Sequence, residues 1–289
     1  MLKANWMIAT LVLVGFVSMA PAATYYLNAN GSVGSTLWSS TPAGGESIAE
    51  PTTGDTNIWD LNGKNLTFPE VIGGSEFFGG TLVVEGLSDT LYDAKTGWKA
   101  QSLNFGNGAS IQGGKNNTAA AQIKGTLTMT GGTGTYITGG GNVGLTVASM
   151  AGSGTLRFAP TPSNTKTVTL TCNDVGSFTG IIQVAAAPTG TGAVTFRFNT
   201  ATTEATFGME LTTTVAGKLL LDTGGDNLHL TSLSLGGEEI AAGDYVKTDF
   251  TVAQQAFIGT VGTISIVPEP ATMSLLALGG MAMLKRRKK

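Results

Sequence analysis

The sequence contains few residues that commonly act as nucleophiles, general bases or metal ligands: it has one histidine, His229, and one cysteine, Cys172, in 289 residues. A single imidazole and a single thiol exclude a His–Cys zinc cluster and an intramolecular disulfide. His229 alternates with Leu228 and Leu230, so we expect it on the outer, hydrated face of a β-strand and not as a general base. We expect Cys172 to be a buried small hydrophobic residue, and no cofactor is expected.

The acidic residues do not form an evident catalytic pair. Residues 106–194 contain a single acid, Asp174, whereas a polysaccharide hydrolase or lyase needs paired carboxylates or a Lys or Arg base. Glu238 and Glu239 stand beside a predicted turn and are expected to be solvated surface charges. The sequence therefore predicts a protein that is not an enzyme and has no catalytic residues; a polysaccharide-degrading enzyme is the least favoured alternative.

Two glycine-containing patterns resemble ligand sites. Asp222, Asp226 and Asn227 flank a Gly-Gly turn and could ligate calcium, but calcium loops supply several oxygens at fixed spacing, so we favour a plain turn. Residues 139–144 satisfy G-x-G-x-x-G, yet a dinucleotide site needs a helix next, and residues 145–147 predict a strand. No metal ligand and no cofactor-binding residue is predicted.

Aromatic residues concentrate in the first third of the chain, where Trp38, Trp59 and Trp98 supply three of the four tryptophans. Exposed indoles could stack on sugars and form a carbohydrate-binding module. Alternatively, bulky rings could cap the first coil of a repeat structure and prevent end-to-end association. We favour the cap and keep the three tryptophans as candidate glycan contacts.

The composition defines the fold class that positions these residues. The chain has 42 Gly and 43 Thr, 42% hydrophobic residues and 12% charged residues, which excludes a coiled coil, a helical bundle and a disordered polyelectrolyte. Short apolar runs alternate with period two, and a Gly-x-Leu phrase recurs at residues 80–84, 125–129, 154–158 and 217–221. We predict an all-β, right-handed parallel β-helix of 10 to 12 coils with about 20 residues each. Antiparallel β-sandwiches are the alternative.

The N-terminus has the three parts of a secretory signal peptide. Lys3 precedes an apolar run of about 12 residues, too short for a membrane-spanning helix, and Ala20-Pro21-Ala22 forms a small-residue cleavage site. We predict export by the Sec machinery and cleavage after Ala22, with Ala20 and Ala22 as the cleavage-site residues. A retained N-terminal anchor is the alternative.

The C-terminus combines a proline motif, an apolar run and a basic end. Pro268, Glu269 and Pro270 stop any strand, and residues 271–284 can then form a helix of about 21 Å, shorter than a hydrocarbon core of about 30 Å. The basic end consists of Lys285, Arg286, Arg287, Lys288 and Lys289. These five cations predict an orientation with the end of the tail in the cytoplasm. We predict transient inner-membrane anchoring.

Removal of both ends leaves a mildly acidic body. It would carry 10 Lys and Arg against 18 Asp and Glu, a net charge of −8. No basic stretch remains for phosphate contacts, so no nucleic-acid partner is expected. An acidic surface suits a soluble extracellular protein.

The C-terminal features together resemble those of PEP-CTERM proteins of Gram-negative bacteria, with Pro268, Glu269 and Pro270 as the sorting motif and Arg286 and Arg287 within the basic stop. The resemblance implies sorting, and cleavage of the tail, by an exosortase, with the body delivered to the cell surface or extracellular polymer. A tail anchor without processing is the alternative. Residues 37–40, 54–60 and 178–184 resemble passengers with autotransporter-associated repeats, which also implies a β-helix.

The sequence thus predicts a structural or adhesive surface protein in five segments, with extracellular polysaccharide as a candidate partner and a carbohydrate-binding module as the alternative function. The segments are a signal peptide (1–22), an aromatic cap with the first coils (23–105), Gly/Thr-rich coils (106–227), closing coils and cap (228–266), and a sorting signal (267–289) with a short transmembrane segment (271–284).

Overall fold

The computed structural model describes most of the chain between its two ends. The described residues are 21–35, 38–69, 75–93, 97–113, 120–138, 144–160, 167–175, 177–184, 193–199, 202, 204–211 and 219–267. The predicted signal segment (apart from residues 21 and 22) and the predicted transmembrane segment lie outside these residues.

The described residues are mostly β-strands. The strands are β1 (Thr24–Leu27), β2 (Gly31–Ser32), β3 (Trp38–Ser39), β4 (Ile58–Asp60), β5 (Asn65–Phe68), β6 (Ser75–Glu85), β7 (Thr90–Asp93), β8 (Trp98–Gly106), β9 (Ser110–Gln112), β10 (Ala121–Thr138), β11 (Leu145–Pro160), β12 (Val168–Cys172), β13 (Ser177–Phe178), β14 (Ile181–Val184), β15 (Val194–Phe198), β16 (Gly208–Leu211), β17 (Leu219–Asp222), β18 (Leu228–Leu230), β19 (Ser232–Leu235), β20 (Glu238–Glu239), β21 (Gly243–Tyr245) and β22 (Ile264–Ile266). A 3-10 helix, η1 (Lys247–Asp249), and one short helix, α1 (Val252–Gln255), lie between β21 and β22.

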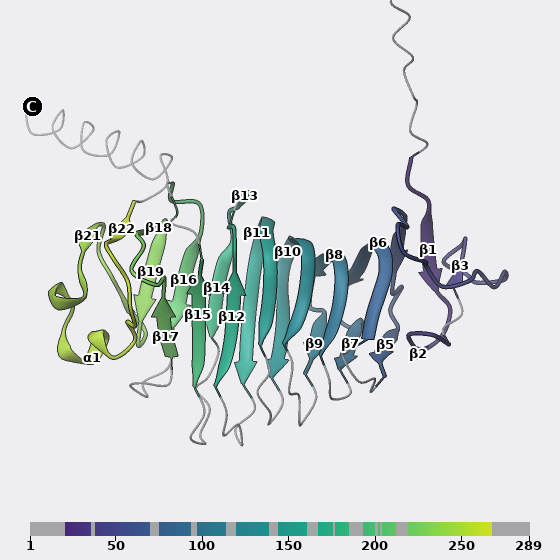
Figure 1. The fold of residues 1–289 in the computed structure, drawn as a ribbon, viewed down its shortest axis with the longest axis horizontal. Helices are drawn as coiled ribbons and strands as arrows, with labels where there is room; N and C mark the ends of the chain where they lie inside the picture. The colour runs from purple at the N-terminus through teal and green to yellow at the C-terminus, as the bar shows by residue number, and fades with distance from the viewer. Residues whose placement is uncertain are drawn as a thin grey trace, which may run out of the picture.

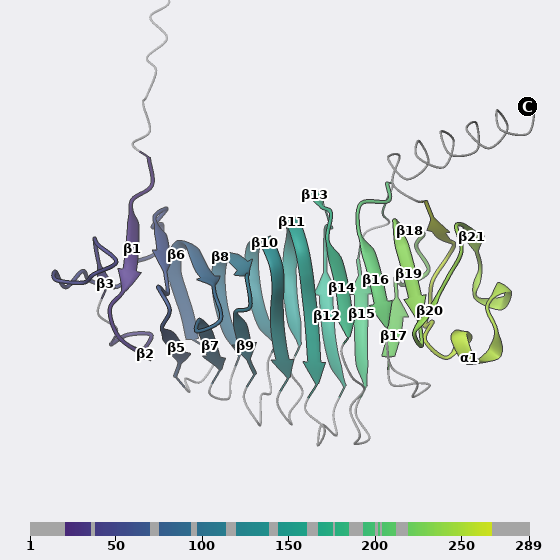
Figure 2. The same cartoon turned by 180° about the vertical axis from the view of Figure 1, so that it is seen from behind.

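The strands wind into a parallel β-solenoid, which confirms the predicted fold class and shows that the antiparallel-sandwich alternative is wrong. In Figures 1 and 2 the chain advances along the long axis, from β1 at one end to β21 at the other. Between the two ends of the rod, strands pair in parallel with the strand one coil later. Such pairing satisfies the backbone of every internal coil through its neighbours.

The walls form three faces. On face 1, the first segments of β6, β8, β10 and β11 pair in that order, and the stack continues with β12, β15 and β17. Face 2 stacks β1 and β4 on the following segments of β6, β8, β10 and β11, and then on β13. Face 3 stacks β5, β7 and β9 on the last segments of β10 and β11, and then on β14, β16 and β19.

Most coils are longer than predicted. Leu91 and Ile111, which pair across one coil, are separated by the predicted coil length. Ile182 and Met209 also pair across one coil but lie further apart in the sequence, as do most partners on this face. Because longer coils use more of the chain, the body contains fewer coils than predicted.

Glycines of the recurring phrase lie where a strand bends from one face to the next. Gly80 and Gly125 occupy the register shifts within β6 and β10, where the chain turns from face 1 to face 2. Gly154 lies at the following corner of β11, with φ +133°. The leucine two residues later is buried in each case, at Leu82, Leu127 and Leu156, so the phrase marks a corner followed by a core position.

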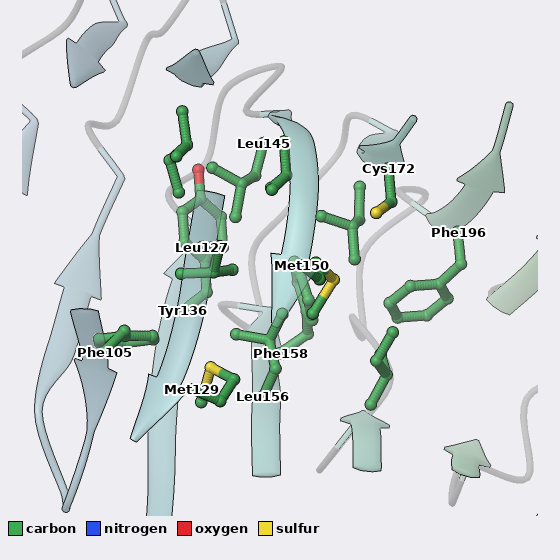
Figure 3. Packing of buried hydrophobic residues seen from close by; sticks show 14 of the residues in the cluster. Phe105, Leu127, Met129, Tyr136, Leu145, Met150, Leu156, Phe158, Cys172 and Phe196 are labelled. Carbon is green, nitrogen blue, oxygen red and sulfur yellow. The ribbon is translucent and has the colours of Figure 1, made fainter. Parts of the chain in front are cut away.

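One hydrophobic core runs through the solenoid. It extends from Leu27 to Ile266 without interruption between the segments that the sequence suggested. Figure 3 shows its middle, where Tyr136 of β10, Phe158 of β11 and Phe196 of β15 contribute to the same interior. The described coils therefore share one continuous interior.

The outer surface carries rows of polar side chains from successive coils. The Arg157 Nε atom donates to Gln183 Oε1 at 2.8 Å, and Gln183 Nε2 donates to Glu210 Oε2 at 2.7 Å. Hydroxyls also pair across coils, as between Thr126 and Ser149 at 2.9 Å. The period-two pattern thus places threonines and amides outside and apolar residues inside, as the composition suggests.

Candidate functional site

The C-terminal end of the solenoid is built from a three-stranded sheet in the order β18–β22–β21. β22 lies in the centre: Ile264 pairs with Leu228 of the parallel neighbour β18 and with Tyr245 of the antiparallel neighbour β21. Figures 1 and 2 show this sheet with α1 at the end of the rod opposite β1. The antiparallel partners cover the last coil, which protects a solenoid from adding further strands.

β22 is buried along its whole length. The relative exposure of Ile264 is 1%, of Ser265 7% and of Ile266 4%. The Leu228 N–H donates to the Thr263 carbonyl at 2.9 Å, and the Val267 N–H donates to the Leu230 carbonyl at 2.8 Å. Val267, the residue directly before Pro268, is half exposed, at 52%.

The three tryptophans proposed as candidate glycan contacts are buried. Trp38, Trp59 and Trp98 have relative exposures of 0, 1 and 0%. Trp38 packs edge-on against Trp59, with ring centroids 5.0 Å apart, and Trp98 stacks on Phe68 at 5.4 Å. None of the three presents a ring face to solvent, so the glycan-contact prediction is wrong for these residues.

The packing of Trp38 against Trp59 belongs to the N-terminal end of the rod, where β3 and β4 both pair with β1. β3, which begins with Trp38, pairs antiparallel with β1, and Trp38 also bridges Ile48. This arrangement covers the first coil in the way that the cap interpretation of the aromatic segment requires.

The lone histidine and cysteine take the places that the sequence pattern predicts. His229 projects between the buried Leu228 and Leu230 and is itself partly exposed. Cys172 is buried, its Sγ donates to the Asp174 carbonyl at 3.3 Å, and burial raises the pKa of its thiol to about 12. The thiol is therefore a packing element, because a nucleophile needs an accessible thiolate.

Two of the three side chains of the candidate calcium turn, Asp222 and Asn227, use oxygens internally. Asp222 accepts from the Gly224 N–H at 2.9 Å and from the Arg197 guanidinium at 2.9 Å, and Asn227 Oδ1 accepts from the Thr263 N–H at 2.9 Å. Burial pulls the pKa of Asp222 upward, but the Gly224 N–H and Arg197 outweigh it and hold the pKa below its usual value. In the part of the chain that the structure describes, no three His, Cys, Asp or Glu side chains converge to hold a metal.

Asp89 is a buried acid that the sequence analysis did not single out. Its side chain is 0% exposed, and its Oδ2 accepts from the Glu85 N–H at 2.8 Å. Burial raises the pKa of Asp89 to about 6, against the lowering effect of the Glu85 and Gly63 N–H groups, and the nearby charges of Asp60 and Glu85 add to the rise. The Asp89 N–H donates to the Gly86 carbonyl at 3.1 Å, and the Asp89 carbonyl accepts from the Ser110 N–H of the next coil at 3.0 Å.

We expect Asp89→Asn to flatten the pH dependence of stability. A pKa raised above its unfolded value of about 3.9 makes stability greatest below pH 4, and this contribution is lost as the pH rises through about 6. The wild-type protein should therefore lose up to about 2 kcal/mol of unfolding free energy from this group between pH 4 and 7.

Urea denaturation at several pH values measures the effect, with Glu239→Gln, an exposed acid on β20, as the control. Asp89→Asn should gain stability relative to wild type at pH 7 and not at pH 4. An equal difference at both pH values would contradict the assignment of this carboxyl.

The fold and its C-terminal junction together define a class of protein: a capped β-solenoid whose last core strand runs directly into a terminal signal. Residues 267–289 match the family model described as the PEP-CTERM protein-sorting motif. The motif marks an exported protein sorted to the cell surface through an exosortase. No curated protein and no solved structure matches the chain, so the autotransporter resemblance stays a prediction.

The matched residues include every member of the predicted sorting motif and basic stop: Pro268, Glu269, Pro270, Lys285, Arg286, Arg287, Lys288 and Lys289. These residues lie outside the described part of the structure, as does Ala20 of the predicted signal cleavage site. Ala22 is described and exposed, two residues before β1. Within the described ranges, no helix has the length and apolar character needed to cross a membrane.

Proposed function

We propose that the protein is a structural or adhesive component of the cell surface or extracellular matrix of a Gram-negative-type bacterium. It is exported by the Sec machinery, held transiently in the inner membrane by residues 271–284, and released when an exosortase cleaves its tail. The match of residues 267–289 to the PEP-CTERM sorting motif carries this proposal. The covered ends of the solenoid support it, because a capped rod stays soluble and extended outside the cell.

We propose that the body acts by presenting its surface and not by catalysis. The buried thiol of Cys172 and the internally bonded turn at Asp222 support this view, since neither offers a reactive group. Trp38, Trp59 and Trp98 lie in the core and do not contact a polysaccharide. The groups that contact extracellular polysaccharide are therefore the outward rows of hydroxyl, amide and charged side chains, such as Arg157–Gln183–Glu210. These rows repeat along the rod and so suit weak, multivalent adhesion.

The sorting proposal predicts that the double variant Pro268→Ala/Glu269→Ala keeps its tail. The protein is produced as the full chain in cells that contain an exosortase, and the mass and location of the product are measured. Wild type should lose the tail and reach the surface, whereas the variant should accumulate unprocessed in the membrane fraction.

Glu239→Ala, which removes an exposed glutamate of the body, is the matched control and should be processed like wild type. Normal processing and location of the double variant would refute sorting through this motif.

A further inference from the structure

The sorting motif adjoins the best-protected strand of the C-terminal cap. β22 ends at Ile266, and Val267 still donates its N–H to Leu230. One half-exposed residue, Val267, therefore separates the buried sheet from Pro268. A single residue spans about 3.3 Å when fully extended, so the motif begins within one residue's reach of the folded cap.

This position matters because enzymes that cut or transfer peptide bonds commonly bind their substrate as an extended strand, through its backbone N–H and C=O groups. The backbone of Ile264–Ile266 is paired on both sides, with β18 and with β21. An enzyme that grips the chain just before the motif would compete with two strands for the same groups.

The apolar side chains of β22 are packed in the core of the solenoid. Ile264 and Ile266 belong to the continuous core together with Leu228 and Leu230 of β18. Detaching β22 exposes these apolar side chains and breaks both ladders, so the detached state is a minor population of the folded protein.

We propose that β22 gates processing: the exosortase engages the motif productively only while β22 is detached from β18 and β21. The folded cap thus slows tail removal, and a chain whose last strand has not yet docked is processed fastest. This inference rests on the proposed sorting function and adds to it a coupling between folding of the cap and release from the membrane.

The test is a flexible spacer between the cap and the motif. Six residues of alternating Gly and Ser inserted between Val267 and Pro268 in the full chain add up to about 20 Å of reach. In cells that contain an exosortase, pulse-chase labelling should show the tail lost at least about tenfold faster than from wild type. The same insertion between the exposed Thr53 and Gly54, far from the cap, should leave the rate unchanged.

A pair of core variants gives an independent measurement. Ile264→Ala weakens β22 and should speed tail removal, whereas Ile182→Ala truncates an equally buried isoleucine on face 3 and should not. Equal effects of the two variants would mean that general instability, and not detachment of β22, controls the rate. Where either variant fails to fold, the spacer variant, whose core is intact, decides the outcome.

The spacer result separates the two proposals when it is combined with Pro268→Ala/Glu269→Ala. If the motif variant blocks processing while the spacer leaves the rate at the wild-type value or lowers it, gating by β22 is overturned and sorting stands. If the motif variant is processed normally with and without the spacer, the sorting proposal itself is overturned.

Discussion

Phe158→Ala is expected to lower the free energy of unfolding by about 3 to 5 kcal/mol. Phe158 is fully buried on face 3, with its ring centroid 5.4 Å from that of Tyr136 and 5.3 Å from that of Phe196. Figure 3 shows these rings packed together from three coils. Removing the central ring takes away contacts on both sides and leaves a cavity that strands fixed by parallel ladders cannot close.

Urea denaturation followed by far-UV circular dichroism measures the loss. Arg157→Ala is the matched control, because Arg157 precedes Phe158 on the same strand but points outward to Gln183. Its expected cost is below about 1 kcal/mol, as for other exposed polar contacts. Similar losses in the two variants would mean that Phe158 is not a central core residue.

Gly152→Ala is expected to destabilise the solenoid by at least about 3 kcal/mol. Gly152 lies in β11 with φ +79°, a conformation that costs any other residue about 1 to 2 kcal/mol. In addition, a Cβ atom there would lie 2.1 Å from the Met129 carbonyl oxygen of the preceding coil. That oxygen belongs to a paired strand, so relief of the clash requires two coils to separate.

Gly237→Ala separates the two contributions. Gly237 has a similar φ of +85°, but a Cβ atom there meets nothing within 4 Å. Thermal unfolding should show a loss of about 1 kcal/mol for Gly237→Ala and a much larger loss for Gly152→Ala. Equal losses would show that the coils of the solenoid are not packed as closely as the structure indicates.

The sequence was sufficient to predict the fold class, because the information is local. Alternation with period two and glycine before a buried leucine, as at Gly80 and Leu82, predict a strand that begins at a corner. The same phrase does not specify position within a coil: Leu82 and Leu127 lie on face 2, whereas Leu156 lies on face 3. Coil lengths depend on how far each loop runs before the chain returns to its partner strand, so the number of coils was overestimated.

Burial of polar and aromatic side chains could not be predicted, because it depends on residues distant in sequence. Trp59 is enclosed by Tyr25, Trp38 and Phe77, which lie in three other segments of the chain. Asp89 follows an ordinary turn and is buried by the coils on either side. The sorting motif, in contrast, is a contiguous pattern at residues 267–289, and its residues were predicted by number.

The sequence predicts a strand at the residues of β22, but it does not predict that this strand lies in the centre of the terminal sheet. Ile264 pairs with Leu228 and Tyr245, and both partners are distant from it along the chain. Those pairings place the strand before the motif in the middle of the terminal sheet. The coupling between cap folding and sorting follows from this long-range arrangement.

The most direct test is the intact mass of the protein recovered from the outer surface of cells that contain an exosortase. A folded solenoid exported and sorted through its tail predicts a surface chain that begins near Ala23, retains β22, and lacks the basic residues 285–289. A full-length chain found as a soluble cytosolic protein, with both terminal segments still attached, would contradict the account.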